Sequence, residues 1–269
     1  MTSLFDGTQP IIGMVHLDPL PGAPKATGDL SAVIEAAVRD AERLVTGGVD
    51  GLLIENYGDA PFYPDVPKHT VAAMTRLAVA VRRAVDCPVG INVLRNDPEA
   101  ALSIAAAVEA DFVRVNVHTG TAVTDQGVIE GRAHETLRLR EQLGVDTAIL
   151  ADVDVKHATP LAGDRSIGDR VSDLVERGLA DGVIVSGIAT GEAVDTDTLD
   201  QAVAARTDRG LSTPILAGSG VTADSAAQLL SIADGAIVGT ALKEGGRTTN
   251  PVDVDRVEQL MAAAEAART

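Results

Sequence analysis

Polar side chains that can do chemistry stand at or just past the ends of short apolar runs in this chain. The set that we assign to a catalytic site is His16, Glu55, Asn92, Arg114, Asn116, Asp152, Asp154 and Lys156. Burying such groups without partners is very costly, so a fold tolerates them only when they pair with one another, with a metal or with a ligand. Two interpretations stay open: a functional site, or a satisfied buried network that joins Arg114 to Asp152. The same network interpretation joins Asn92 to Asn116.

Three of these residues are carboxylates, and oxygen ligands suit a hard divalent cation. Glu55, Asp152 and Asp154 together predict a Mg²⁺ or Mn²⁺ site, although their spacing matches no recognised metal motif. Nothing in the sequence indicates an organic cofactor. Lys156 has two open roles, as a lysine that forms a Schiff base or as a positive charge that neutralises Asp154 or binds a second phosphate. We favour the electrostatic role.

Histidines are acid–base candidates because an ordinary imidazole titrates near neutral pH. His16 ends an apolar run, His118 follows another, and His157 lies beside the predicted lysine. Each of the three is equally well explained as a loop or capping histidine. His134 falls inside a stretch with helical spacing, and we place it on the surface.

Strand-to-glycine endings near the end of the chain point to a phosphate site. The runs 214–220 (Pro-Ile-Leu-Ala-Gly-Ser-Gly) and 235–240 (Gly-Ala-Ile-Val-Gly-Thr) each turn from apolar residues into small ones, and a third such ending closes the run 182–186. Glycines let the backbone turn sharply and bring its N–H groups close to an anion. The predicted phosphate-binding residues are Ser186, Gly187, Gly218, Ser219, Gly220, Gly239 and Thr240, with Thr190 and Gly191 nearby.

Eight short apolar runs position these residues. The runs cover residues 11–17, 51–56, 89–94, 112–117, 148–153, 182–186, 215–217 and 236–238, separated by stretches with helical spacing. Alternating strands and helices predict a parallel sheet with right-handed crossovers. We therefore predict a single (β/α)8 TIM barrel over residues 1–269, an architecture that commonly binds phosphate after its last strands. The alternative, a doubly wound open sheet, normally has its glycine fingerprint after the first strand. Predicted helix N-caps are Ser31, Asp97 and Thr222.

Strand alternation predicts which polar side chains face the barrel interior. Valines flank Arg114 and Asn116, so these two polar side chains are expected to point inward. Asp152, Asp154 and Lys156 likewise share one face of their strand. Polar residues at the C-terminal end of a barrel usually serve function, which favours a site over a purely structural network.

The composition is acidic. Asp and Glu outnumber Lys and Arg by 39 to 22, which gives a net charge of −17. Such a surface repels nucleic acid and anionic membranes; it suits a halophilic, salt-adapted protein or, in the plainer interpretation, an ordinary acidic enzyme. The lone Cys87 excludes an intramolecular disulfide, and no apolar run is long enough to span a bilayer. We expect a cytoplasmic protein that binds neither nucleic acid nor membrane.

Scarce aromatic residues gather in the proline-rich segment 57–68. This segment holds both tyrosines of the chain, Tyr57 and Tyr63, and one of its three phenylalanines, Phe62. It follows the second predicted strand, so it belongs to the end of the barrel that carries function. A lid, a subunit contact and a packed connector all fit, and we expect a homo-oligomer.

Several motifs resemble the BtpA/SgcQ family. They are ENYGDAPF at 55–62, TVAAMT at 70–75, GINVLRND at 90–97, RVNV at 114–117, DQG at 125–127, ADVDVKHA at 151–158 and VGTALK at 238–243. The resemblance covers nearly the whole chain and implies a TIM barrel of the ribulose-phosphate-binding kind. The family is named for a role in photosystem I biogenesis, whereas other members sit with genes of sugar transport and metabolism. No catalytic residue is carried over from it.

Two classes of function follow. The first is an enzyme, of the aldolase, isomerase or lyase type, that acts on a phosphorylated sugar or nucleotide-derived small molecule. Its support is a polar constellation opposite a phosphate site. The second is a non-catalytic assembly or biogenesis factor, or a regulatory protein that binds a phosphorylated ligand. A scaffold has no need for convergent charges at a barrel mouth, so we favour the enzyme.

Overall fold

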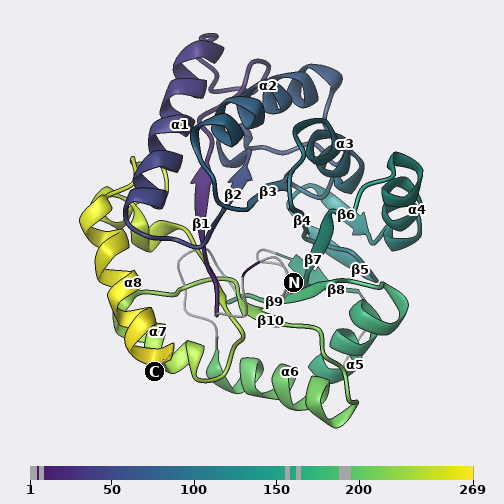
Figure 1. The fold of residues 1–269 in the computed structure, drawn as a ribbon. Helices are drawn as coiled ribbons and strands as arrows, with labels where there is room; N and C mark the ends of the chain where they lie inside the picture. Colours follow the sequence, from purple (N-terminus) through teal and green to yellow (C-terminus); the bar gives the residue numbers. More distant parts are fainter. Residues whose placement is uncertain (1–4, 6–8, 155–157, 162–164, 188–194, 269) are drawn as a thin grey trace.

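Eight parallel strands close into a barrel in the computed structural model, which describes residues 5, 9–154, 158–161, 165–187 and 195–268 (Figure 1). The barrel strands are β1 Ile11–His16, β2 Gly51–Glu55, β3 Val89–Asn92, β4 Phe112–Val115, β7 Ala148–Asp154, β9 Gly182–Val185, β10 Ile215–Ala217 and β11 Ala236–Val238. Seven of them lie within predicted runs, and β7 extends one residue beyond the run 148–153. The ring closes where β1 pairs with β11, Ile11 opposite Ala236. The TIM-barrel prediction is therefore confirmed, and the open sheet is wrong.

Helices surround the barrel (Figure 1). They are α1 Leu30–Thr46, α2 Lys68–Ala84, α3 Pro98–Val108, α4 Ala133–Leu143, α5 Ile167–Ser172, α6 Thr196–Asp208, α7 Ala223–Leu230 and α8 Val254–Arg268, with short turns η1 Tyr57–Asp59, η2 Asp173–Arg177, η3 Thr240–Leu242 and η4 Glu244–Gly246. Asp97 and Thr222 cap α3 and α7 as predicted. The prediction for Ser31 is wrong, because Asp29 caps α1 and accepts the Ser31 N–H. Within the described ranges, no helix is long and apolar enough to cross a membrane.

The barrel interior is filled by inward-pointing side chains of successive strands. The cluster consists of Phe5, Ile12, Met14, Leu53, Phe112, Leu150, Ile184, Leu216 and Ile237. Phe112 fills the space that Gly90 leaves, because a Cβ built on Gly90 would lie 2.1 Å from the Phe112 ring. Phe5 packs edge-on against Phe112 with ring centroids 6.2 Å apart. Since the interior is packed solid below, any site must lie at the mouth above this cluster.

A small antiparallel sheet, which the sequence analysis did not predict, lies beside the barrel (Figure 1). It has the strand order β6-β5-β8, from β5 Thr121–Thr124, β6 Gly127–Glu130 and β8 Ala158–Pro160. Its strands come after β4 and after β7, so the sheet belongs to the carboxyl ends of the barrel strands. The β5–β6 turn consists of Asp125 and Gln126.

Alternation along β7 breaks near the strand end. The register against β9 shifts between Asp152, opposite Ile184, and Asp154, opposite Val185. The parity argument therefore holds as far as Asp152 and does not extend to Asp154, whose side chain lies outside the described part. Lys156 and His157 also lie outside the described residues, as do Thr190 and Gly191.

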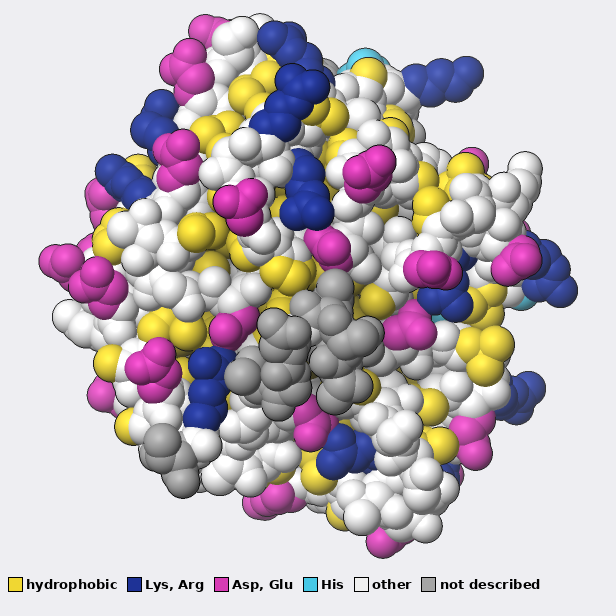
Figure 2. Space-filling model, in the orientation of Figure 1, with side chains coloured by type: hydrophobic (Ala, Val, Ile, Leu, Met, Phe, Trp, Pro, Cys, Tyr) yellow, Lys and Arg dark blue, Asp and Glu magenta, His cyan; other side chains and the backbone are white. Residues whose placement is uncertain are grey.

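On one face of the molecule, acidic side chains are spread out and do not gather in one patch (Figure 2). On the face shown in Figure 2, Asp and Glu side chains are scattered between basic and uncharged ones. Many surface arginines pair with aspartates, as Arg140 does with Asp181 at 2.7 Å. Because 39 acidic side chains face only 22 lysines and arginines, the chain keeps a net charge of −17 even if every basic side chain pairs with an acidic one.

Candidate functional site

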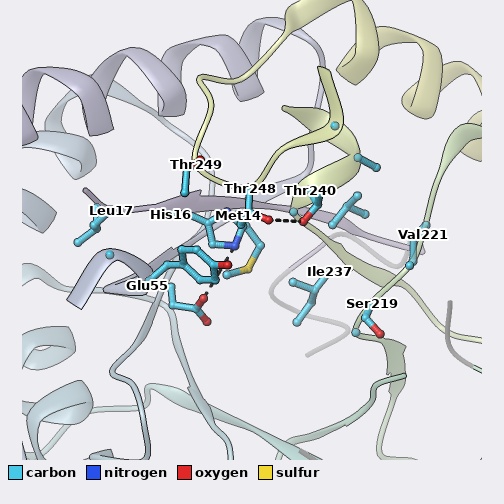
Figure 3. Close-up of a pocket in the computed structure, with 18 of the residues that line it drawn as sticks. Met14, His16, Leu17, Glu55, Ser219, Val221, Ile237, Thr240, Thr248 and Thr249 are labelled. Atoms are coloured by element: carbon cyan, nitrogen blue, oxygen red, sulfur yellow. Dashed lines mark hydrogen bonds and ion pairs between the residues drawn. The ribbon is translucent and has the colours of Figure 1, made fainter. Parts of the chain in front are cut away.

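A cavity of about 1420 Å³ opens at the C-terminal mouth of the barrel (Figure 3). The predicted site residues that line it are His16, Glu55, Arg114, Asn116, Gly218, Ser219, Gly220, Gly239 and Thr240. Asn92, Asp152, Ser186 and Gly187 are described but do not line it. The structure thus brings one acid–base pair and two of the predicted glycine turns around one space.

His16 and Glu55 form a pair in the wall of the cavity. They end β1 and β2, and the strand register places them side by side. His16 Nε2 lies 3.8 Å from Glu55 Oε1, and each side chain is 9% exposed. The Tyr57 ring packs edge-on against the imidazole, with centroids 5.0 Å apart. An imidazole and a carboxylate are both proton-transfer groups, so their place in one wall makes the pair a candidate for acid–base chemistry.

Arg114 and Asp152 form a buried ion pair at the top of the barrel core. Arg114 donates from Nε and Nη2 to the two Asp152 oxygens, both at 2.9 Å. Asn116 donates to Asp152 Oδ2 at 3.0 Å, and Asn92 donates to Asn116 Oδ1 at 3.1 Å. Burial by itself lowers the pKa of Arg114, but the charges of Asp152 and Glu55 raise it above its ordinary value. The network interpretation therefore describes these four residues, except that the buried Asn92 Oδ1 has no hydrogen-bond partner within the described part of the chain.

Asp152 has little left to offer a cation. Both carboxylate oxygens accept from Arg114, and Oδ1 also accepts from the Ser186 hydroxyl at 3.3 Å. The described residues contain no group of three His, Cys, Asp or Glu side chains able to hold a metal ion. Asp152 therefore does not fit the role of ligand, and the Mg²⁺ or Mn²⁺ site through Glu55, Asp152 and Asp154 stays a prediction.

The glycine turns after β10 and β11 line the cavity, whereas the described part of the turn after β9 does not line it and packs against the β10 turn. The Gly187 N–H donates to the Ser219 hydroxyl at 2.6 Å. Gly218 packs against this wall, because a Cβ on it would lie 2.5 Å from Ser186 Oγ. Gly220, with φ +65°, turns the chain toward α7. These contacts leave the turns after β10 and β11 as the part of the predicted phosphate site that faces the cavity.

The other side of the predicted phosphate site is formed by the segment after β11. Thr240 and Thr248 share a hydrogen bond between their hydroxyls at 2.9 Å (Figure 3). Arg256, in the first turn of α8, donates to the Ala241 carbonyl at 3.2 Å and lines the cavity. The sequence analysis missed Arg256, because nothing in the pattern of α8 distinguishes it from a surface arginine.

Gly239 connects the phosphate end to the acid–base pair. A Cβ built on it would lie 2.7 Å from His16 Cε1. The imidazole of β1 therefore occupies the space beside the β11 turn that any side chain would need. A ligand held by the Gly239–Thr240 turn is in reach of His16.

Arg95 is a second missed residue. Its guanidinium lies 5.0 Å above the centre of the Phe62 ring, and its Nε donates to the side-chain Oε1 of Gln126 at 3.1 Å. Its Nη2 lies 3.7 Å from Asp125, and its side chain is 11% exposed and lines the cavity. The sole signal in the sequence was its place three residues beyond a strand end, since the partners come from two unrelated loops.

Segment 57–68 begins at the cavity, which Tyr57, Gly58, Ala60 and Phe62 line. The side-chain Oδ1 of Asn56 accepts the Leu94 N–H at 2.7 Å, and the Asp59 carboxylate accepts the Leu20 N–H at 2.8 Å. Gly58 lies so close to the Asp18–Pro19 backbone that a Cβ would meet it at 2.5 Å. These contacts tie the start of the segment to two neighbouring loops.

The other histidines with a described place stand away from this space. His118 is buried, and its Nε2 lies 2.8 Å from the Gly178 carbonyl. Burial lowers its pKa, partly offset by that hydrogen bond. His134 is exposed on α4, as predicted. His118 does not line the cavity, so a structural role fits it better than catalysis.

Comparison with known sequences gives one consistent family. A sequence model of the BtpA family matches residues 7–266. An uncharacterized protein of Thermococcus kodakarensis is 49% identical over 261 residues, covering 97% of each chain. A Synechocystis protein named photosystem I biogenesis protein BtpA is 48% identical over 260 residues, covering 96% of this chain and 89% of that protein.

Comparison with solved structures supports the fold. N-(5′-phosphoribosyl)anthranilate isomerase of Pyrococcus furiosus aligns over 95% of this chain and 98% of its own, with a TM-score of 0.59 and 10% identity. Tryptophan synthase of Mycobacterium tuberculosis aligns over 99% of this chain and 96% of its own, with a TM-score of 0.60 and 19% identity. At such low identity the likeness concerns the barrel alone.

Proposed function

The chain belongs to the BtpA family, which confirms the resemblance seen in its motifs, and we propose that it is an enzyme acting on a phosphorylated sugar or nucleotide-derived small molecule. The reaction class is that of an aldolase, isomerase or lyase, in which a proton is moved at a carbon or oxygen near a carbonyl group. The site is the cavity at the C-terminal mouth of the barrel.

The observation that carries this proposal is the sharing of one cavity by two kinds of group. Backbone turns at Gly218–Gly220 and Gly239–Thr240 suit a phosphate dianion. The His16–Glu55 pair suits proton transfer. Since Gly239 and His16 are in contact, a phosphate bound at the turn leaves the rest of a small ligand against the imidazole.

The names of the structural relatives agree with this class. The name of the Pyrococcus furiosus relative gives a phosphoribosyl substrate and an isomerase reaction. The likeness at 10% identity brings no residue across, so the roles assigned here rest on this chain's own geometry. The acidic surface also suits a small ligand that enters a lined cavity better than a nucleic acid chain.

A matched pair of glycine variants tests the phosphate site. Gly220 and Gly210 both have φ +65°, but Gly220 lines the cavity, and a Cβ on Gly210 meets nothing within 4 Å. Valine at either position strains the backbone to a similar degree. Gly220→Val should abolish heat protection by fructose 6-phosphate, and Gly210→Val should keep it. Equal protection of both variants would show that the phosphate binds elsewhere.

Catalysis is tested at His16. His16→Gln removes the titrating group and keeps a polar side chain of similar reach. The variant should still bind phosphorylated compounds that protect the parent protein from heat, while turnover of whichever compound the parent converts falls at least a hundredfold. Conversion at the parent rate by the variant would remove His16 from the mechanism.

A second candidate is a non-catalytic assembly factor, which the name of the Synechocystis relative favours. An assembly role makes no use of a buried acid–base pair. If none of a panel of sugar phosphates is converted by the parent, and His16→Gln leaves every measured property of the protein unchanged, this second candidate takes the place of the enzyme.

A further inference from the structure

We propose that the ligand of this cavity carries two anionic groups, with the first in the glycine turns and the second bound by Arg95. This inference rests on the proposed function and deepens it, because it names the substrate class as a doubly anionic small molecule. The second group is a phosphate or a carboxylate, both of which match a guanidinium.

Arg95 is positioned like a binding residue. Its planar group stacks over Phe62 and is held through Nε by Gln126, both of them uncharged. The nearby carboxylate, Asp125, lies 3.7 Å from Nη2, beyond hydrogen-bond distance, and is 61% exposed. Side chains without charge therefore hold the guanidinium in place, and its ion pair with Asp125 is longer and more exposed than the buried pair of Arg114 with Asp152.

Arg114 shows what a fully compensated arginine looks like in the same cavity wall. Arg114 donates two hydrogen bonds of 2.9 Å to the Asp152 carboxylate, and the Asp152 side chain has no exposed surface. An arriving anion would have to compete with that carboxylate. Of these two cavity-lining arginines, Arg95 has the weaker protein partner, because Asp125 is exposed and lies beyond hydrogen-bond distance, so a ligand anion competes with it more easily than with Asp152.

The barrel order places Arg95 opposite the phosphate turns. Around the ring the strands run β1-β11-β10-β9-β7-β4-β3-β2, so β3 stands four positions from β10 in a ring of eight. Arg95 follows β3, and Gly218–Gly220 follow β10. One of the two paths between them passes over β1 and β2, which carry His16 and Glu55. A ligand held at both ends along that path therefore places its middle at the acid–base pair.

The size of the cavity fits such a ligand. Its volume of about 1420 Å³ exceeds the roughly 300–1,000 Å³ usual for small-molecule sites. A molecule with a single phosphate would leave the Arg95 end filled only by water. A molecule with charge at both ends uses the whole mouth.

Calorimetric titration of two matched pairs of compounds tests the proposal at constant salt. Fructose 6-phosphate is compared with fructose 1,6-bisphosphate, and glucose 6-phosphate with 6-phosphogluconate. In at least one pair the doubly anionic compound should bind the parent at least tenfold more tightly, about 1.4 kcal/mol. The pair that shows the preference identifies the second group as phosphate or carboxylate.

Arg95→Gln should reduce that preference to twofold or less and leave binding of the singly anionic compounds unchanged. Arg138→Gln, on the exposed face of α4, makes the same change of charge and should have no effect. A preference that survives Arg95→Gln, or a parent that shows none in either pair, overturns the proposal.

Asp125→Asn provides an independent test that does not depend on the folding of the Arg95 variant. Asp125 is 61% exposed, so the amide should fold normally. Removing its negative charge beside Arg95 should tighten the doubly anionic compound at least twofold and leave its singly anionic counterpart unchanged. Equal changes in both compounds would show that Arg95 does not receive the second group.

Failure of this inference is distinguishable from failure of the proposed function. If the parent binds none of the four compounds, the phosphate site itself is wrong. If the singly phosphorylated compounds bind and Gly220→Val abolishes that binding, but the second charge adds nothing, only the assignment of Arg95 is wrong.

Discussion

The two halves of the barrel mouth differ in where their polarity resides. The half formed by β1, β2, β3, β4 and β7 carries charged and amide side chains, which largely satisfy one another, as Arg114 and Asp152 do. The half formed by β9, β10 and β11 ends in glycine, serine and threonine and offers backbone turns. The first half is a self-contained network that shapes the site. The second offers mainly backbone groups, although Arg256 and the carboxylates Asp224, Asp253 and Asp255 also line the cavity on this side.

This difference teaches which polar residues of a barrel mouth are free to act. A side-chain charge deep in the mouth needs a partner from the same protein, so its presence does not by itself indicate catalysis. In this cavity the buried charges of Arg114 and Asp152 hold each other, and His16, Glu55 and Arg95 also line the space.

The strongest test of the comparison removes a partner from the self-contained half. Asp152→Asn leaves the buried Arg114 charge without its main counter-ion and should reduce the free energy of unfolding by about 3–5 kcal/mol, measured by chemical denaturation. Asp65→Asn breaks the exposed Arg132–Asp65 pair, whose side chains are 36% and 59% exposed, and should cost less than about 1 kcal/mol. An Asp152 variant as stable as the Asp65 variant would contradict the network interpretation.

The next largest effect is expected from a change at Gly239, where the two halves of the mouth meet beside His16. Gly239→Ala places a methyl group 2.7 Å from His16 Cε1 and must move the imidazole away from its place beside Glu55. We expect turnover to fall at least tenfold, with a stability loss of about 1–3 kcal/mol. Gly210→Ala serves as the control without a neighbour within 4 Å. Unchanged turnover in Gly239→Ala would separate the phosphate end from the acid–base pair.

A buried histidine away from the mouth extends the comparison to pH. Burial holds the pKa of His118 below its ordinary value, so the unfolded chain binds more protons than the folded one below about pH 6.5. Stability should therefore fall as pH drops through this range, by up to about 1.4 kcal/mol per pH unit from this group. His118→Gln should lessen that slope, whereas the exposed His134→Gln should keep it. Denaturation midpoints between pH 7 and pH 5 decide, and identical slopes in both variants would remove His118 as the cause.

The smallest predicted effect concerns the surface. With a net charge of −17, screening of self-repulsion by salt should stabilise the fold. Each kcal/mol gained would raise the melting temperature of a chain of this size by roughly 2–4 °C. Melting curves in dilute and in molar KCl test this, and a temperature that stays constant would leave the ordinary acidic interpretation in place.

Local patterns predicted the barrel well. Each of the eight strands was visible as a short apolar run, because a strand buried on both faces is apolar along its length. Asp97 before Pro98 and Thr222 before Asp224 were also visible as helix starts, because a capping side chain bonds to the backbone within one turn of its own position. Ser31 was wrong because Asp29, two residues earlier, also satisfies the pattern and takes the bond.

The small sheet was not predictable in this way. Its strands are three or four residues long and partly exposed, so they show neither an apolar run nor a clear alternation. It forms from two segments that follow different barrel strands, and only the closed barrel brings those segments together. The turn of this sheet supplies Asp125 and Gln126 beside Arg95.

The sequence by itself determined the barrel, the glycine turns after β10 and β11, and the inward face of Arg114 and Asn116. Only the tertiary structure decided that Asp152 pairs with Arg114, that His16 lies beside Glu55 and Gly239, and that Arg95 stacks on Phe62 beside Gln126. The physical reason is that strand formation and alternation depend on neighbours along the chain, whereas charge pairing depends on neighbours around the ring. Those neighbours are separated by a helix or more in sequence and meet only when the barrel closes.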